Sequence, residues 1–292
     1  MSTTTRSDGR TYDQLRDIMI VYEGLDGVDG SARFGFGQTQ SLTSVSGPME
    51  VRPNLEQPSQ ATLDISVRPL VGIAGTDSKA LSTNLKAILA PALFLSHHPR
   101  TLIQIVGQAL CGTESGSGLG SVGKGWNATL VASLINATSA ALVNASSVPM
   151  KGVICAVSVG RFPSASAATL VLDPSEAELP HLVGGGCFAF LFSSALPLTP
   201  SSPDELPPCS LLWTNYTSSV VYDDTELRQA QALAEEGARK VWAAMKESVS
   251  NMERTAQCPA FNRFKSAKTE SRVKKDTKNL SESEVDDDKM EI

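Results

Sequence analysis

The segment that says most about the fold reads Gly30-Ser-Ala-Arg-Phe-Gly-Phe-Gly-Gln-Thr-Gln-Ser-Leu-Thr-Ser-Val-Ser-Gly-Pro-Met-Glu-Val-Arg-Pro-Asn54. The residues on either side of Gly35–Gly37 favour two short strands, and the glycines favour the turn between them. The pair Gly47-Pro48 predicts a break, after which a new extended segment begins. We therefore expect a hairpin followed by a further extended piece.

The composition allows a sizeable aliphatic core. The chain has 292 residues, 41% of them apolar and only 5% aromatic. This length fits one large domain or two small ones. The net charge of −6 argues against a protein that holds nucleic acid by bulk attraction, because Lys and Arg must neutralise the phosphates. Any RNA contact is expected to be local or shared with a partner.

The N-terminal residues and the cysteines predict a reduced, non-secreted protein. Residues 1–16 are polar, and the first apolar run, 18–22, is too short for a signal peptide or a membrane span. The five cysteines form no Cys-x-x-Cys pair and are odd in number. They support neither a zinc knuckle nor a disulfide framework, and we expect mostly buried thiols.

Periodicity predicts alternating strands and helices. We expect extended structure over 21–36 and 40–46, strands at 61–69, 101–110, 152–159, 167–172, 187–192 and 211–214, and helices at 79–95, 126–146 and from Asp223 onward. In the first strand after the hairpin Leu63, Ile65 and Val67 share one face. Pro91 should kink or end the first helix. This order favours an α/β sandwich with right-handed crossovers.

The end of the chain differs in composition. Residues 263–278 contain seven basic and two acidic side chains, whereas 279–292 contain one basic and six acidic. With so few apolar residues such a segment cannot offset the entropy lost on ordering. We therefore predict one domain over 1–255, with loop-like inserts at 112–125 and 195–208, and a disordered charged tail over 256–292.

A glycine-rich loop, Gly118-Leu-Gly-Ser-Val-Gly-Lys-Gly125, lies between a predicted strand and a predicted helix. It matches both G-x-G-x-x-G and the start of a phosphate-binding loop, G-x-x-x-x-G-K. The magnesium-binding hydroxyl position is occupied by Gly125, and no acidic residue follows within 126–145. A flexible insert is the favoured interpretation, and nucleotide binding through 118–125 stays open as an alternative.

Several segments in order resemble one family. The hairpin and its "GP-EV" continuation resemble the signature of the RNase PH-like family, which contains phosphate-dependent 3′→5′ exoribonucleases and ring subunits of the RNA exosome. The supporting segments are Arg6-Ser-Asp-Gly-Arg10, His98-Pro-Arg-Thr101, Val148-Pro-Met150, Thr169-Leu-Val-Leu-Asp-Pro174 and Tyr222-Asp-Asp-Thr-Glu-Leu227. They resemble the eukaryotic exosome branch, of the ribosomal-RNA-processing protein 46 type. The resemblance covers most of 6–250 and implies a βαβα sandwich of the ribosomal protein S5 domain 2-like class.

In active members a Gly-Gly-Thr-Arg loop and a helical Arg hold the attacking phosphate, and a pair of Asp handles protons or a metal. Carried onto this chain, the loop falls at Asn127-Ala-Thr129-Leu130, so the Arg position is Leu130. The helical Arg falls near Leu81. The first Asp is Asp173, but the second is Leu179, with Glu178 one residue before it.

The resemblance therefore implies a catalytically inert ring subunit in which Thr129, Asp173 and Glu178 are vestiges, with no cofactor and no metal site. Arg52 and Arg100 are the candidates for RNA contact. The implied partners are other RNase PH-like ring subunits, S1/KH-type cap subunits and single-stranded RNA in the channel, with no membrane. The implied locations are nucleus, nucleolus and cytoplasm, with roles in rRNA processing and mRNA decay. An active phosphate-dependent exoribonuclease is the first alternative.

Overall fold

The computed structural model describes residues 6, 8–111, 126–163, 169–193 and 207–256. The chain divides into two compact units, Met1–Met245 and Lys246–Ile292. The first unit holds both sheets. Of the second, only the end of one long helix falls among the described residues. The predicted insert 112–125, most of the insert 195–208 and the tail from 257 lie outside them, and so does the glycine-rich loop 118–125.

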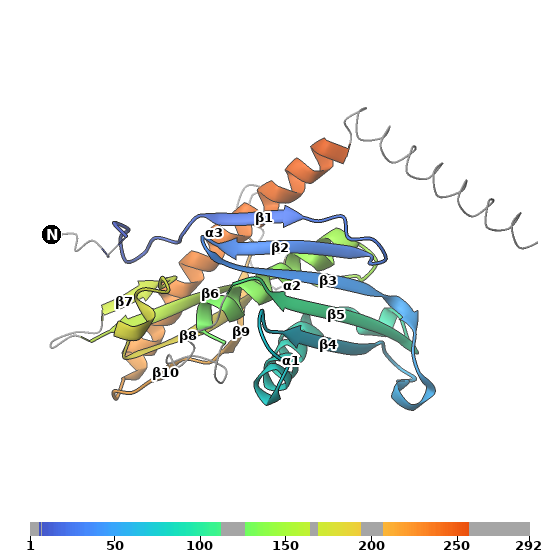
Figure 1. The fold of residues 1–292 in the computed structure, drawn as a ribbon, viewed down its shortest axis with the longest axis horizontal. Helices are drawn as coiled ribbons and strands as arrows, with labels where there is room; N and C mark the ends of the chain where they lie inside the picture. The colour runs from blue at the N-terminus through green and yellow to red at the C-terminus, as the bar shows by residue number, and fades with distance from the viewer. Residues whose placement is uncertain (1–5, 7, 112–125, 164–168, 194–206, 257–292) are drawn as a thin grey trace, which may run out of the picture. The chain divides into compact units, whose positions relative to one another are not determined.

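The first sheet is mixed and has five strands in the order β1-β2-β3-β5-β4 (Figure 1). The strands are β1 (Ile18–Tyr22), β2 (Gly30–Phe36), β3 (Thr39–Glu50), β4 (Thr62–Arg68) and β5 (Thr101–Ala109). All neighbouring pairs are antiparallel except β4 and β5, which are parallel. That parallel pair requires a crossover, which α1 (Thr76–Leu89) supplies.

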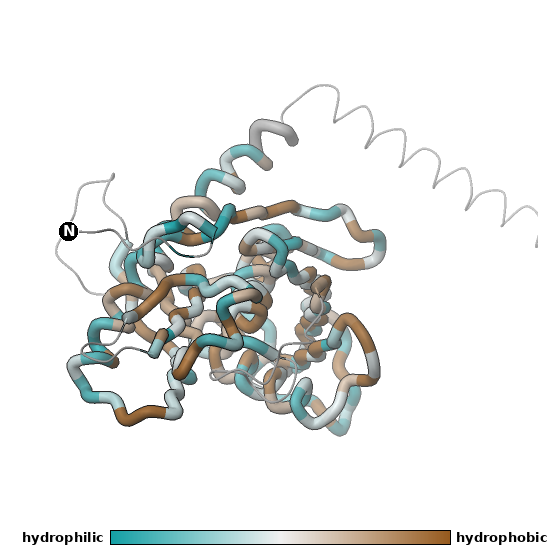
Figure 2. Tube along the Cα trace, turned by 60° about the vertical axis from the view of Figure 1, so that its left-hand side comes forward, coloured by the Kyte–Doolittle hydropathy of each residue, from teal (hydrophilic) through white to brown (hydrophobic). Residues whose placement is uncertain are grey.

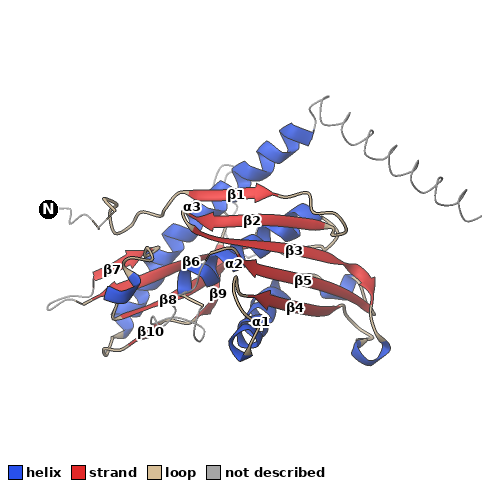
Figure 3. Ribbon diagram, in the orientation of Figure 1, coloured by secondary structure: helices blue, strands red, loops and turns tan. Residues whose placement is uncertain are grey.

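The second sheet is antiparallel and follows the order β10-β8-β6-β7, with β9 also paired to β8. Its strands are β6 (Val153–Phe162), β7 (Thr169–Leu172), β8 (Gly184–Phe192), β9 (Cys209–Thr214) and β10 (Thr217–Ser218). Figure 3 shows both sheets in red and the helices in blue. The helix α3 (Asp224–Ala256) follows the last strand, and its Ala230, Ala234 and Val241 are buried in the first unit.

The central helix α2 (Ala128–Ala145) is the core of the first unit. Fifteen of its residues, from Ala128 to Leu142, are buried, and it packs on β2 and β3 of one sheet and on β6 and β8 of the other. By length and composition α2 is apolar enough to cross a membrane, but 83% of that window is buried inside the protein. Its hydrophobicity is therefore explained by its position between two sheets.

One polar residue, Asn136, and one small residue, Gly30, allow α2 to pack closely on the two sheets. The Asn136 side chain accepts a hydrogen bond from Ala156 N and donates one to Ala156 O, at 2.7 and 2.8 Å. It therefore satisfies the backbone of β6 in a part of that strand that β7 does not reach. On the other sheet, Gly30 lies against the end of α2, where a Cβ atom would come within 2.4 Å of Ala145 N.

Most predicted elements are confirmed, with three corrections. The segment 21–36 is not continuous, because β1 ends at Tyr22 and β2 begins at Gly30. Gly47-Pro48, a cis peptide, does not end a strand: β3 continues to Glu50, and only its register with β5 shifts between Ser46 and Met49. The first helix starts and ends earlier than predicted, at Thr76 and Leu89, with Pro91 in the 3-10 turn η2 (Ala90–Ala92) that follows.

The four cysteines among the described residues are free thiols, as expected. Cys155 and Cys187 are buried, and desolvation raises the pKa of both thiols far above the ordinary value. Cys111 and Cys209 are half-buried rather than buried.

The close approach of β2 to α2 predicts that Gly30→Ala destabilises the domain by about 2–3 kcal/mol, because the new methyl group meets backbone atoms that cannot move aside. Chemical denaturation of the purified chain measures this. Gly24→Ala is the matched control, since nothing lies within 4 Å of its added Cβ. Equal stability of the two variants would contradict the packing described.

Candidate functional site

The two candidate carboxylates lie where the N-terminal segment crosses the end of β7. Leu172 N donates to Tyr12 O at 2.8 Å, and the buried Arg6 donates to Leu172 O at 2.8 Å and to Asp173 O at 2.9 Å. Asp173 directly follows β7, and Glu178 immediately precedes the 3-10 turn η4 (Leu179–His181). The N-terminal residues thus bring guanidinium groups to both carboxylates.

Asp173 is completely buried and is held by Arg16. The Nε and Nη2 atoms of Arg16 donate to the two carboxylate oxygens at 2.8 and 2.7 Å, and the Arg16 backbone N–H adds a third bond at 3.0 Å. Burial acts to lower the pKa of Arg16, but the Asp173 carboxylate outweighs it and raises that pKa. Asp173 also has a left-handed φ of 48°, and its N–H donates to Ser158 O. A metal ion at this carboxylate would have to displace Arg16.

The Glu178 carboxylate is also fully engaged in hydrogen bonds. Its carboxylate accepts two hydrogen bonds from the Arg6 guanidinium, one of them from Nε at 2.9 Å, and a third from Ser175 N at 2.8 Å. The side chains of Arg6 and Glu178 are 0% and 6% exposed. Burial acts to raise the pKa of Glu178, but the Arg6 and Ser175 hydrogen bonds outweigh it and hold that pKa below its usual value. The pair is therefore a structural ion pair.

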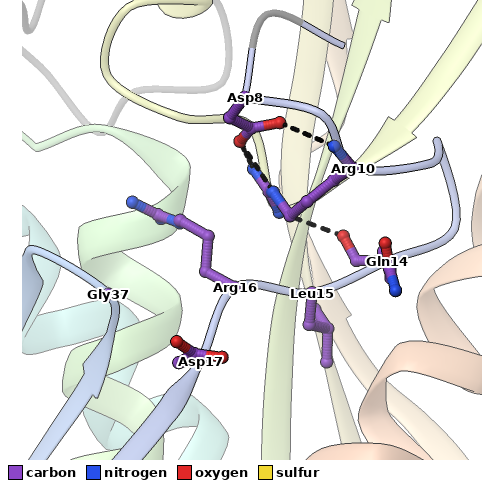
Figure 4. Close-up of a pocket in the computed structure, with 7 residues that line it drawn as sticks. All are labelled: Asp8, Arg10, Gln14, Leu15, Arg16, Asp17 and Gly37. Atoms are coloured by element: carbon purple, nitrogen blue, oxygen red, sulfur yellow. Dashed lines mark hydrogen bonds and ion pairs between the residues drawn. The ribbon is translucent and has the colours of Figure 1, made fainter. Parts of the chain in front are cut away.

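A third arginine lies in an open cleft of about 390 Å³ between the N-terminal segment and the β2–β3 turn. Figure 4 shows Arg10 between Asp8 and Gln14, with Arg16 beside them. Arg10 donates to the Asp8 carboxylate, to Gln14 O and to Asp173 O. These partners occupy every nitrogen of the Arg10 guanidinium, so both arginines among the described residues that line the cleft, Arg10 and Arg16, are already paired.

Thr129 lies at the start of α2 and close to the same place. Its hydroxyl is buried and lies 2.9 Å from Ser158 Oγ and 3.5 Å from Pro174 O. The N-cap Asn127 accepts a hydrogen bond from Leu130 N at 2.7 Å. A helix N-terminus can bind phosphate through such N–H groups, but here the Asn127 side chain takes the Leu130 N–H, and the Thr129 hydroxyl lies in hydrogen-bond contact with Ser158.

The apolar residues at the expected ligand positions belong to the core. Leu130, Leu81 and Leu179 are 0%, 0% and 7% exposed. The lysines nearest Leu81 in sequence, Lys79 and Lys86, lie on the exposed side of α1. Within the described ranges no group of three or more His, Cys, Asp or Glu side chains could hold a metal ion. The three predicted vestiges, Thr129, Asp173 and Glu178, are thus brought together, and the guanidinium groups described beside the two carboxylates, Arg6 and Arg16, are paired with them.

The arginines predicted to contact RNA lie at the other end of β3. Arg52 follows the β3 end, and Arg100 precedes the start of β5; the last ladder pair between these strands is Glu50 with Thr101. Both side chains are exposed. Arg100 has a φ of 60° and pairs with Glu56 at 3.3 Å, and its N–H donates to Gln57 O. No finding tests the RNA role, which stays a prediction.

Sequence reasoning assigned no role to Arg6, Arg10 or Arg16. Arg6 and Arg10 belong to the segment Arg6-Ser-Asp-Gly-Arg10, which supports only the family resemblance. The arginines are far in sequence from the carboxylates that they bind. Arg6 and Glu178 are 172 positions apart, and Arg16 and Asp173 are 157 positions apart. The local periodicity of the sequence does not indicate such an ion pair, so only the three-dimensional structure could identify these arginines as its partners.

Comparison with known proteins identifies the class. Residues 14–147 match the family model RNase_PH, the 3′ exoribonuclease family, domain 1. The chain is 44% identical over 92 residues to exosome complex component RRP46 of Saccharomyces cerevisiae, covering 32% of this chain and 40% of that protein. It is 30% identical over 174 residues to the exosome complex exonuclease RRP46 homolog of Oryza sativa, covering 60% and 66%. Both alignments span less than two thirds of the relative's length.

A longer share is covered in exosome complex component Rrp41 of Pyrobaculum aerophilum, which is 30% identical over 183 residues, 59% of this chain and 67% of that protein. Among solved structures, rice Rrp46 has a TM-score of 0.65 at 23% identity, covering 84% of this chain and all of that one. An archaeal exosome core has a TM-score of 0.59 at 17% identity, covering 83% and 91%. These structures show the mixed α/β RNase PH domain fold. The chain belongs to the RNase PH family.

The Arg6–Glu178 pair predicts a specific acid sensitivity. Because the folded-state pKa of Glu178 lies below its usual value near 4.5, the pair stabilises the protein at neutral pH, and the contribution falls as pH drops below about 4.5. Glu178→Gln should cost about 3 kcal/mol at pH 7, since it leaves a buried guanidinium without its counter-charge. The free energy of unfolding of the Glu178→Gln variant should also fall less steeply than that of the original protein as the pH drops below about 4.5.

Denaturation of both proteins between pH 3 and pH 7 measures the effect. Glu176→Gln is the control, because Glu176 is an exposed carboxylate in the same turn. If both substitutions have the same small effect at every pH, the pair does not stabilise the fold as described.

Proposed function

We propose that this protein is a non-catalytic subunit of the RNase PH-like ring of the RNA exosome. The proposal rests on Leu130 and Leu179, both buried, at the positions where the family resemblance expects a phosphate-binding Arg and a second catalytic Asp. The similarity to RRP46 of Saccharomyces cerevisiae and Oryza sativa supports membership of the exosome.

The physical reason for inactivity is the state of the charged groups. A phosphate dianion needs hydrogen-bond donors and positive charge to remain bound beside an anionic RNA backbone. The arginines nearest Asp173 already satisfy Asp173, Glu178, Asp8 and backbone carbonyls. A phosphate bound here would have to break these contacts, and breaking those to Asp173 or Glu178 would leave a buried carboxylate without its partner.

The work of the protein is then structural. We infer that it pairs with other RNase PH-like subunits and contacts S1/KH-type cap subunits, so that single-stranded RNA threads through the closed ring to a nuclease elsewhere. Arg52 and Arg100, exposed at one end of the first sheet, are the proposed RNA contacts. The net charge of −6 is compatible with such a local contact and not with bulk attraction. Nucleus, nucleolus and cytoplasm are the proposed locations, in rRNA processing and mRNA decay.

One observation favours a second candidate, an active phosphate-dependent 3′→5′ exoribonuclease. The rice relative carries the name exonuclease. Activity in this chain would require Glu178 to serve as the second carboxylate, and Glu178 would first have to leave Arg6. The third candidate, nucleotide binding through 118–125, falls on residues outside the described ranges.

The test is phosphorolysis by the purified chain of oligo(A) in the presence of phosphate and magnesium. We expect no release of nucleoside diphosphate above the level of a blank preparation, because the phosphate ligands are missing. Release that Asp173→Asn abolishes would contradict the proposal. Circular dichroism of that variant confirms that the loss is not unfolding, and co-elution of activity with the chain excludes a contaminating nuclease.

Purification from cells tests the other half of the proposal. The tagged full chain should be recovered in a stable complex with other RNase PH-like subunits. Recovery of the chain without them would contradict a role in the ring.

A further inference from the structure

The strand β1 is an edge strand of the first sheet. It pairs antiparallel with β2, and within the described part of the chain no strand pairs with its other side. Figure 1 shows β1 at the margin of the sheet, and Figure 2 shows its residues in the colour of hydrophobic side chains. An edge strand presents a row of backbone donors and acceptors to which another chain can add a strand.

The register identifies which backbone groups face outward. Gly37 N donates to Asp17 O at 2.9 Å, and Glu23 N donates to Ser31 O at 3.3 Å, both in register with the β1–β2 ladder. In an antiparallel pair, alternate residues direct both backbone groups at the partner strand. Met19 and Val21 therefore bond to β2, like Asp17 and Glu23. The N–H and C=O groups of Ile18 and Ile20 point away from the sheet.

The residues of β1 are not of the types that usually protect an edge against strand addition. Residues 18–22, Ile-Met-Ile-Val-Tyr, contain no charge, no Pro and no Gly. The opposite edge of the same sheet, β4, carries the exposed charges Asp64 and Arg68. Natural edge strands that stay unpaired are kept so by charges, Pro or bulges. The contrast between the two edges of one sheet points to β1 as the edge that accepts a partner.

The strand is also held in place for pairing. Ile18 and Ile20 pack against the core, whereas Val21, on the other face, is 44% exposed. A strand that is already ordered loses little entropy when another strand is added. An exposed carboxylate, Asp17, precedes the apolar run, whereas Glu23 after it is half-buried and paired with Arg33. An incoming strand that is apolar in its middle and carries Lys or Arg at an end would complement this pattern.

We propose that the outward edge of β1 accepts an extended strand, apolar in its middle and basic at an end, from a neighbouring RNase PH-like subunit. The first sheet would then continue across the boundary between two subunits. Ile18 and Ile20 would supply two N–H donors and two C=O acceptors to the added strand. This inference rests on the proposed function, because it names the surface through which one neighbour in the ring is held.

Residue-resolved amide hydrogen exchange tests the proposal directly. In the isolated chain, the amides of Met19 and Val21 should exchange slowly and those of Ile18 and Ile20 quickly, since only the former bond to β2. In the purified complex the Ile18 and Ile20 amides should slow by roughly tenfold or more, with little change at Met19 and Val21. The two neighbouring amides serve as an internal control for general burial.

A charge on the exposed face of the strand provides a second test. Val21→Lys leaves the backbone of β1 unchanged but places a cation beside the incoming strand, and it should reduce recovery of the neighbouring subunit by roughly tenfold. Leu25→Lys is the matched control: Leu25 is 40% exposed in the loop after β1, so the variant carries the same added charge outside the strand.

The outcomes separate this inference from the proposed function. If the complex forms and the Ile18 and Ile20 amides still exchange quickly, the β1 surface is wrong while the ring role stands. If no complex with RNase PH-like subunits forms, the ring role fails and takes this surface with it. Protection that instead appears in the isolated chain as its concentration rises would assign the edge to a second copy and overturn the partner proposed.

Discussion

The packing of α2 between two sheets is the constraint on which the rest of the first unit depends. A helix buried over nearly its whole length must be apolar and small where backbones approach, and Gly30 meets that need at the end of the helix. It must also satisfy the backbone it covers, which Asn136 does for β6. Because α2 cannot shift, its first turn is fixed beside Ser158 and the residues after β7.

The position of that first turn is central to the proposal that this chain keeps the family fold without the family's chemistry. In the family, the same place brings a phosphate site and a carboxylate pair together. Here the carboxylates Asp173 and Glu178 remain, but Arg16 and Arg6 convert them into buried ion pairs that fasten the N-terminal segment to the domain. The positions that the family resemblance assigns to phosphate binding hold Leu81 and Leu130, which contribute to the core.

How far the sequence predicts this structure depends on whether the signal is local. The alternation in β4 and the apolar faces of α2 and α3 reflect burial within one element, so those elements could be predicted. Gly47-Pro48 could not be read correctly, because β3 continues through it with a change of register that only the pairing with β5 defines. The family resemblance located Thr129, Asp173 and Glu178. It did not reveal that distant arginines occupy the two carboxylates, since that depends on contacts across the whole domain.

The most direct measurement is a crystal of the chain soaked in sulfate, an anion with the shape and donor requirements of phosphate. The proposed loss of the phosphate site predicts no ordered sulfate at the start of α2, with Arg16 still on Asp173 and Arg6 still on Glu178. A sulfate ordered beside Thr129 and Asp173, with arginine side chains turned toward it, would contradict the account and restore the case for a phosphate-dependent nuclease.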